Sequence, residues 1–167
     1  MRLLFVCTGN ICRSPLAEAA FAAQARARGL EGRFEVDSAG THGWHAGERA
    51  DPRAIEVGAR HGVPVTSLAR AVRPSDFRDF DLILAMDRGH LNDLRRRCPP
   101  EWRGKIELLR DYDHPGAPPD VPDPYYGELG DFEDVFDTVS TCARHLLERL
   151  MQAHVAPARE APAAPDA

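Results

Sequence analysis

A short apolar segment near the N-terminus, Arg2 to Val6, is followed by a glycine-containing turn and then by a helical pattern. The segment has the length and composition of a strand buried in a sheet. After the turn, Ser14 is a suitable helix cap, Pro15 suits the start of a helix, and alanine and leucine recur at helical spacing until Gly29. A buried strand joined directly to a helix is typical of α/β proteins with a parallel sheet.

The same alternation continues along the chain. Further strands are predicted at Phe34 to Ser38, Asp81 to Met86 and Lys105 to Leu109. Further helices are predicted from Asp51 to Gly62, from Asp87 to about Arg97 and from Asp131 to about His154. Because βαβ connections are right-handed, this order predicts a single-domain α/β fold: a four-stranded parallel sheet flanked by helices on both faces, a flavodoxin-like three-layer sandwich. Such sheets bind ligands at the carboxyl ends of their strands.

The predicted domain covers residues 1–154, and residues 155–167 are predicted to form a disordered tail because alanine and proline dominate them. The formal net charge is -5, so the chain as a whole has no electrostatic reason to bind nucleic acid or anionic lipid. No apolar run approaches the roughly 20 residues that span a bilayer. We therefore expect a cytoplasmic protein, a monomer or weak dimer, whose four cysteines are reduced.

The turn after the first strand places a cysteine and an arginine in the pattern Cys-x5-Arg-Ser, directly before a helix. Backbone N–H groups in such a turn point inward, and the helix start adds a partial positive charge, so the turn is suited to bind phosphate. Arg13 offers a planar fork for two phosphate oxygens. The predicted phosphate-binding residues are Thr8, Gly9, Asn10, Ile11, Cys12, Arg13 and Ser14.

Cys7 lies in the same electrostatic field. Helix N-termini and neighbouring cations favour the thiolate of a cysteine, which is the nucleophilic form. Cys7 is therefore predicted to attack phosphorus while Arg13 holds the phosphate, and Asn10 and Ser14 can support the loop by hydrogen bonds. Taken alone, Cys7 also fits a small buried side chain and Arg13 a surface charge; the combination favours the chemical role. A zinc site is not predicted, because Cys7 and Cys12 have no second ligand pair at suitable spacing.

The segment from Val6 to Glu18 resembles the N-terminal signature of the low-molecular-weight protein tyrosine phosphatases almost position for position. Other segments resemble that family's landmarks in the same order: Asp37 to Thr41, Trp44-His45, Asp51 to Ala54, His61-Gly62, Asp79 to Asp87 and Asp123 to Gly127. The resemblance covers about residues 1–150. It implies a phosphotyrosine phosphatase with a phosphocysteine intermediate and no metal or other cofactor, in which Ser38 supports the loop together with Asn10 and Ser14.

Expulsion of the leaving oxygen is easier when a positioned acid protonates it. Asp123 is the candidate, in a loop stiffened by two prolines. On local grounds an Asp-Pro sequence is most often a turn. The resemblance implies that Asp123 is the general acid and then, once ionised, the base that activates water. Asp111, Asp113 and Asp120 are predicted to be solvated loop charges, and Asp87 a helix cap that can also tune the pocket edge.

An aryl phosphate is longer than phosphoserine, so a deep cleft with aromatic walls selects it. Trp44, Tyr125 and Tyr126 can form such walls by stacking. Alternatively, Trp44 packs in the core and the tyrosines close their loop. The resemblance places these residues around the family's cleft, and it bears on Ile11, because members that act on phosphoarginine carry Thr at that position. An apolar Ile11 favours phosphotyrosine.

The implied partners are phosphotyrosine-containing proteins, with a tyrosine kinase as one candidate, and the implied inhibitors are phosphate-like oxyanions. Cys12 lies close enough to Cys7 in sequence to capture an oxidised Cys7 as a disulfide, and the resemblance implies this redox role; a packed thiol is the alternative. Cys98 and Cys142 are predicted to be structural or surface thiols. An arsenate reductase on the same fold would need a second pair of cysteines after the third strand, where only Cys98 lies.

One segment departs from the family. Where a histidine is expected after the second helix, the chain reads Ser67-Leu68-Ala69-Arg70. Any role of that histidine in ordering the phosphate loop cannot be carried over to this chain. A catalytically silent phosphoprotein-binding module is the remaining alternative, but such a module would need neither Cys7 nor Asp123.

Overall fold

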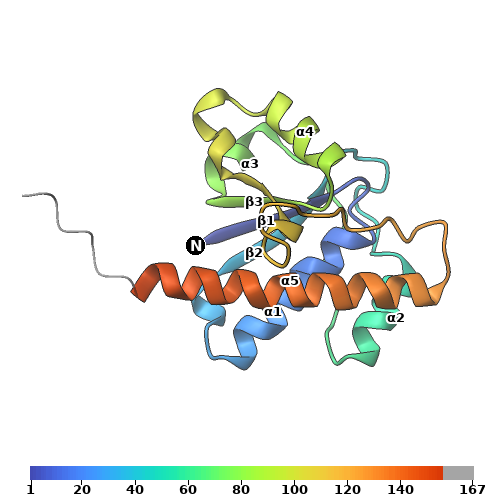
Figure 1. Cartoon of the computed structure of the whole chain (residues 1–167). Helices are drawn as coiled ribbons and strands as arrows, with labels where there is room; N and C mark the ends of the chain where they lie inside the picture. The colour runs from blue at the N-terminus through green and yellow to red at the C-terminus, as the bar shows by residue number, and fades with distance from the viewer. Residues whose placement is uncertain (156–167) are drawn as a thin grey trace, which may run out of the picture.

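The computed structural model describes residues 1–155, with side chains described as far as Ala153. Its centre is a parallel four-stranded sheet in the order β2-β1-β3-β4 (Figure 1). The strands are β1 (Arg2–Cys7), β2 (Glu35–Gly40), β3 (Leu82–Ala85) and β4 (Ile106–Leu108). Leu3 of β1 lies opposite Val36 of β2 on one side and Leu82 of β3 on the other. The predicted parallel sheet is confirmed.

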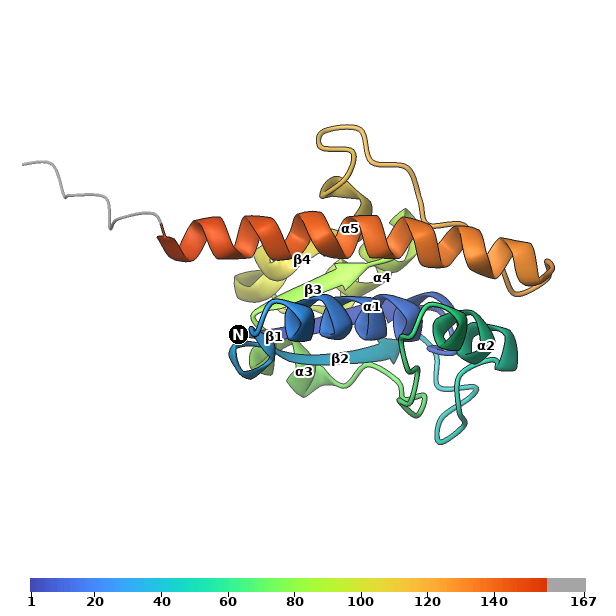
Figure 2. The same ribbon diagram turned by 90° about the horizontal axis from the view of Figure 1, so that it is seen from below.

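Helices cover both faces of the sheet (Figure 2). One face carries α1 (Arg13–Ala27), α2 (Pro52–Arg60) and α5 (Leu129–Val155), and the other carries α3 (Pro74–Asp79) and α4 (Arg88–Arg97). Short 3-10 helices occur at η1 (Glu31–Arg33), η2 (Pro100–Lys105) and η3 (Leu109–Asp111). This three-layer arrangement confirms the predicted fold class.

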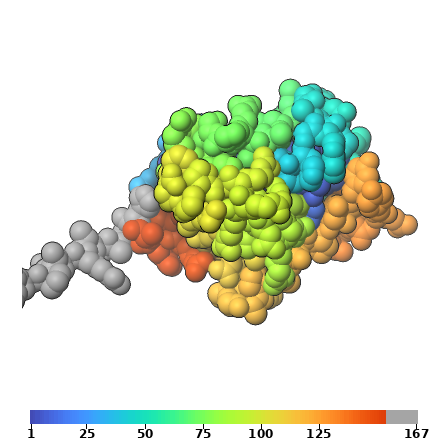
Figure 3. All heavy atoms as spheres, turned by 90° about the horizontal axis from the view of Figure 1, so that it is seen from above, coloured from blue at the N-terminus to red at the C-terminus, as the bar shows by residue number. Residues whose placement is uncertain are grey.

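The carboxyl ends of the strands meet at one edge of the sheet, on the right in Figure 1. The loops there are joined by backbone hydrogen bonds: Thr41 N–H donates to the carbonyl of Cys7, and Val121 N–H donates to the carbonyl of Met86. In the space-filling view, the segment at 41–50 and the segment at 121–128 project at the same end of the molecule, with the N-terminal segment visible between them (Figure 3). Two loops from distant parts of the chain therefore flank the turn after β1.

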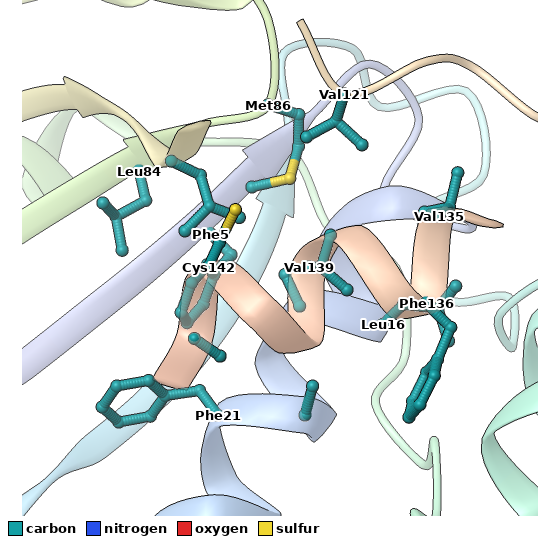
Figure 4. Close-up of a cluster of buried hydrophobic side chains, with 14 of the residues drawn as sticks. Phe5, Leu16, Phe21, Leu84, Met86, Val121, Val135, Phe136, Val139 and Cys142 are labelled. Carbon is teal, nitrogen blue, oxygen red and sulfur yellow. The ribbon is translucent and has the colours of Figure 1, made fainter. Parts of the chain in front are cut away.

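Strand β1, which lies between β2 and β3, is buried on both faces, and its side chains alternate between two hydrophobic clusters. Leu3 and Phe5 pack with α1 and α5, whereas Leu4 and Val6 pack with α3 and α4. Figure 4 shows the first cluster, where Phe5 lies close to Cys142 of α5 and Phe21 of α1. The near-continuous apolar run of β1 follows from this two-sided burial.

Several predicted boundaries differ from the structure. The last helix begins at Leu129 rather than Asp131, and α3, η1, η2 and η3 were not predicted, because such short helices carry too few turns for a periodic pattern. Ser14 does not cap α1: it lies inside the first turn, and its hydroxyl faces the preceding loop. The predicted tail, 155–167, lies outside the described residues apart from the helical backbone of Val155. Among the helices of residues 1–155, none combines the length and apolar character that a membrane-spanning helix requires.

Candidate active site

The turn between β1 and α1 is shaped by Asn10. Its φ is 58°, which makes it the one non-glycine residue within residues 1–155 in the left-handed region. Asparagine tolerates this conformation better than most residues. The side-chain amide donates to Ser14 Oγ at 2.8 Å and to Ser38 Oγ at 2.9 Å. The three predicted loop-supporting residues therefore form one hydrogen-bonded group beneath the turn.

Cys7 lies at the end of β1, 3% exposed, with its Sγ 3.0 Å from Ser14 Oγ. Because the amide of Asn10 already donates to Ser14 Oγ, the hydroxyl hydrogen of Ser14 can be donated either to the sulfur at 3.0 Å or to the carbonyl of Ala39 at 3.5 Å. A hydroxyl that donates to sulfur stabilises its anionic form. This arrangement suits a nucleophilic thiolate.

The support for Asn10 extends to the segment where the family histidine is absent. The backbone N–H of Arg70 donates to Asn10 Oδ1 at 3.0 Å, and the Arg70 guanidinium bridges Asp37 and Asp76, each at 2.9 Å. Ser38 in turn donates to Glu18 Oε2 at 2.6 Å, and burial raises the pKa of Glu18. Arg70 carries no sequence signal for this role, since Asp37 and Asn10, the partners that link it to the sheet and the phosphate loop, lie 33 and 60 residues away along the chain.

Arg13 is 4% exposed and is held by groups from two other loops. Its Nη1 donates to Asp87 Oδ2 at 2.9 Å and to the carbonyl of Val121 at 3.0 Å, and its Nη2 lies 3.5 Å from Thr8 Oγ1. Burial opposes the charge of Asp87, but the hydrogen bond from the His90 backbone N–H and the nearby Arg13 outweigh it and lower the pKa of Asp87. Asp87 is thus both the predicted cap of α4 and the counter-ion of Arg13.

Asp123 lies near Arg13 in the lining of one cleft. Its Oδ2 is 3.8 Å from Arg13 Nη2, its Oδ1 accepts the N–H of Tyr125 at 3.1 Å, and its side chain is 50% exposed. The following carbonyls of Tyr125 and Gly127 each accept a hydrogen bond of 2.9 Å from Arg53 in α2. The loop that bears the candidate acid is therefore attached to a helix far away in sequence.

The other carboxylates near this loop do not share that position. Asp120 pairs with Arg88 at 3.1 Å and is about half exposed, as predicted for a loop charge. Asp111 accepts the N–H of Gly116. The prediction of a solvated loop charge is wrong for Asp113, whose side chain is only 8% exposed and pairs with Arg110 at 3.1 Å. Its ion pair, not solvent, balances its charge.

Most of the predicted residues meet in a cleft of about 280 Å³, but Asn10 and Ser14, which were predicted to bind phosphate, are buried and do not line it. Its lining residues are Cys7, Thr8, Gly9, Ile11, Cys12, Arg13, Trp44, His45, Asp123, Tyr125 and Tyr126. Trp44 is not in the core: it is 68% exposed and stacks on His42 with ring centroids 4.2 Å apart. Tyr126 is 93% exposed and meets Tyr125 edge to face. Large aromatic surfaces thus stand at the rim while the thiol, the arginine and the loop lie at the base.

All four cysteines are buried free thiols. Burial, with Asp51 close by, raises the pKa of Cys12 to about 12, so this neighbour of Cys7 stays a neutral thiol at pH 7. Burial also raises the pKa of Cys98 and of Cys142. Within residues 1–155, no group of three or more His, Cys, Asp or Glu side chains is placed to hold a metal ion.

An anion-binding turn at the carboxyl edge of a parallel sheet, with a thiol and an arginine at its base, is the arrangement of an α/β enzyme that works on phosphate groups. A family model described as low molecular weight phosphotyrosine protein phosphatase matches residues 2–156. A low molecular weight protein-tyrosine-phosphatase of Streptomyces coelicolor is 50% identical over 149 residues, which are 87% of this chain and 91% of the relative.

Solved structures agree with this match. The protein tyrosine phosphatase of Entamoeba histolytica, with Hepes in its active site, superposes with a TM-score of 0.88 at 40% identity and covers 93% of this chain and 99% of its own. The YwlE arginine phosphatase of Bacillus subtilis has a TM-score of 0.83 at 30% identity, covering 91% of this chain and 97% of its own. This chain belongs to the low molecular weight phosphotyrosine protein phosphatase family.

Proposed function

We propose that this phosphatase hydrolyses phosphotyrosine through a phosphocysteine intermediate on Cys7, with Asp123 as general acid and then general base. The observation that carries the proposal is the meeting of Cys7 and Arg13, from the turn after β1, with Asp123, from a distant loop, in one cleft with aromatic walls. The related arginine phosphatase structure, described as a variant with a phosphorylated active-site serine, supports a phosphoenzyme in this fold.

In the first step, the Cys7 thiolate attacks phosphorus and the bond between phosphorus and the tyrosine oxygen breaks. Asp123 gives its proton to the leaving oxygen, so that tyrosine departs neutral. Arg13 and the N–H groups of the turn bind the phosphoryl oxygens. In the second step, a water molecule attacks phosphorus while the Asp123 carboxylate takes its proton. The sulfur–phosphorus bond breaks, and inorganic phosphate and the Cys7 thiolate remain.

The aromatic rim and Ile11 support an aryl substrate. Trp44, Tyr125 and Tyr126 offer stacking surfaces at the opening, and the apolar side chain of Ile11 lines the same cleft. Phosphotyrosine-containing proteins, with a tyrosine kinase as one candidate, are the proposed partners. The preference for phosphotyrosine is tested by comparing the turnover of phosphotyrosine and phosphoarginine peptides. Equal or faster turnover of phosphoarginine would contradict it.

The mechanism is tested with p-nitrophenyl phosphate and phenyl phosphate, a good and a poor leaving group. Cys7→Ser is expected to abolish turnover, and Asp123→Asn to lower kcat by about 10²- to 10⁴-fold for phenyl phosphate and by less for p-nitrophenyl phosphate. Rapid acid quenching of Asp123→Asn is expected to trap phosphate on Cys7.

Two matched controls accompany these variants. Cys98→Ser makes the same change at a thiol far from the cleft, and Asp120→Asn makes it at a carboxylate of similar exposure. Both are expected to retain wild-type kcat. Turnover by Cys7→Ser would refute the mechanism, and phosphopeptide binding by a wild-type chain without turnover would favour the binding module instead.

Cys12 supports a further element of the proposal, reversible protection of an oxidised Cys7 by a disulfide. It lines the same cleft as Cys7, and its neutral thiol keeps negative charge away from the phosphate site during catalysis. Mass spectrometry after peroxide treatment tests this role: a Cys7–Cys12 disulfide that dithiothreitol reverses is expected.

A further inference from the structure

His90 lies in the first turn of α4 and is 5% exposed. It does not line the cleft, yet its Nε2 is 2.7 Å from the hydroxyl oxygen of Thr8, which does. Its other ring nitrogen, Nδ1, is 3.1 Å from Asp87 Oδ1 and has no well-aligned hydrogen-bond partner within the described residues. A buried imidazole is thus placed between the phosphate loop and the counter-ion of Arg13.

The neighbours of the imidazole determine which nitrogen carries its proton. With a proton on Nε2, the lone pair of Nδ1 would face the Asp87 carboxylate at 3.1 Å, which is repulsive. With the proton on Nδ1, the N–H lies beside the carboxylate as an electrostatic contact without hydrogen-bond alignment, and Nε2 accepts the hydroxyl hydrogen of Thr8. The burial that lowers the pKa of His90 to about 4 agrees with a neutral ring at pH 7. The Nδ1–H tautomer is therefore the one that fits.

This tautomer completes a ring of four side chains. Thr8 donates its hydrogen to His90, so its oxygen is left as an acceptor facing Arg13 Nη2 at 3.5 Å. Arg13 Nη1 donates to Asp87 Oδ2, and Asp87 Oδ1 faces His90 Nδ1. In this tautomer no two donors and no two acceptors of the ring lie against each other, although the contact of His90 Nδ1 with Asp87 is not an aligned hydrogen bond. Asp87 Oδ1 also accepts the backbone N–H of His90 at 2.9 Å, which fixes the histidine to the start of α4.

We propose that His90 is a positioning residue: through the Thr8 hydroxyl and Asp87 it holds the Arg13 guanidinium in the orientation that binds the phosphoryl group. The proposal rests on the proposed function of Arg13. It predicts that Thr8 serves the site as an acceptor for Arg13, not as a donor to phosphate, because its one hydrogen is committed to His90. The pairing of Thr8 with His90, 82 residues apart, is then a functional unit.

A double-mutant cycle of Thr8→Val and His90→Asn tests the unit, read as kcat and KM for p-nitrophenyl phosphate. Valine keeps the shape of threonine without its hydroxyl, and asparagine can still face Asp87 but has no atom at the position of Nε2. Each single variant is expected to lower kcat/KM about tenfold, with most of the change in kcat. The double variant is expected to lose about the same tenfold, since both changes remove one contact. Losses that multiply to about a hundredfold would overturn the proposal.

Binding of inorganic vanadate, measured by calorimetry, reports on the anion site without turnover. Both single variants are expected to bind vanadate about tenfold more weakly than wild type. His90→Gln, whose amide oxygen can reach Thr8, is expected to recover most of the loss. Thr141→Val is the matched control, because the hydroxyl of the half-buried Thr141 donates to the carbonyl of Asp137 in its own helix, α5; it is expected to bind and turn over like wild type.

Thermal melting of each variant excludes unfolded protein from the comparison. Unchanged vanadate affinity in folded Thr8→Val and His90→Asn would refute the positioning role. A wild-type chain that binds vanadate but does not hydrolyse aryl phosphates would instead contradict the proposed function, and the vanadate affinities of the variants would still decide whether the ring orients Arg13.

Discussion

Asn10 connects the phosphate loop to three other parts of the chain. Its side chain reaches Ser14 in α1, Ser38 in β2 and the backbone of Arg70, and its own backbone stands in the left-handed region. Few residues can provide both the backbone conformation and the hydrogen bonds. The shape of the loop and its attachment to the sheet therefore depend on one residue.

Asn10→Ala and Asn10→Gly separate these two contributions. Both variants remove the donor to buried Ser14 and Ser38 and are expected to lower kcat at least about tenfold. Alanine also has to adopt a positive φ, so its free energy of unfolding is expected to lie about 1 kcal/mol below that of the glycine variant. Urea unfolding and steady-state kinetics measure the two effects. Equal stability of the two variants would show that the backbone conformation costs little.

At the scale of elements, α2 controls the loop that carries Asp123. Arg53 is held by Asp51 at 2.9 Å, and its guanidinium donates to the carbonyls of Tyr125 and Gly127. The guanidinium also lies 4.4 Å from the ring centre of Phe132 in α5. The far end of the same loop is fixed at Val121 by Arg13 and Met86. A loop held at both ends can present a carboxylate in a defined position.

Arg53→Met is expected to loosen this loop while keeping an apolar stem against Phe132. Because the effect acts through the general acid, kcat is expected to fall about five- to tenfold for phenyl phosphate and less for p-nitrophenyl phosphate. Arg60→Met makes the same change on α2, where Arg60 pairs with Glu56 on the surface, and is expected to leave both rates unchanged. An equal loss with both substrates would mean that Arg53 acts on something other than proton transfer.

At the scale of the whole molecule, the buried His90 makes the free energy of unfolding depend on pH. Burial lowers the pKa of His90 from 6.5 to about 4, against the attraction of Asp87. Between these two values the unfolded chain binds a proton that the native chain does not, so stability falls as the pH falls. Between pH 6.5 and pH 4, the titration of His90 lowers the free energy of unfolding by roughly 3 kcal/mol. Burial raises the pKa of Glu18, which acts in the opposite direction in the acid range.

Urea unfolding of wild type and His90→Asn at several pH values between 6.5 and 4 isolates this term, since Glu18 is common to both proteins. The unfolding free energy of wild type is expected to decrease by about 1.4 kcal/mol per pH unit more than that of the variant. Parallel curves for the two proteins would contradict a neutral buried His90 in the native state.

Local patterns in the chain were sufficient to predict the main strands and the long helices. Burial on both faces makes the strands continuous apolar runs, and burial on one face gives α2 and α4 a periodic pattern of apolar residues. The residues of the turn after β1 were also predictable, since they are consecutive and their chemistry depends on the strand–turn–helix context. Asp123 and the aromatic residues needed the family resemblance, because an Asp-Pro turn and exposed aromatic side chains carry no specific local signal.

The features of the site that the sequence did not predict depend on contacts between residues that are far apart in the chain. The support of Asn10 by Arg70, the attachment of the acid loop by Arg53 and the pairing of Thr8 with His90 each join segments at least 60 residues apart. Each of these residues looks like an ordinary polar residue in sequence. Its role follows only from the packing of the sheet and helices, which buries it beside one particular partner and makes an unpaired polar group costly.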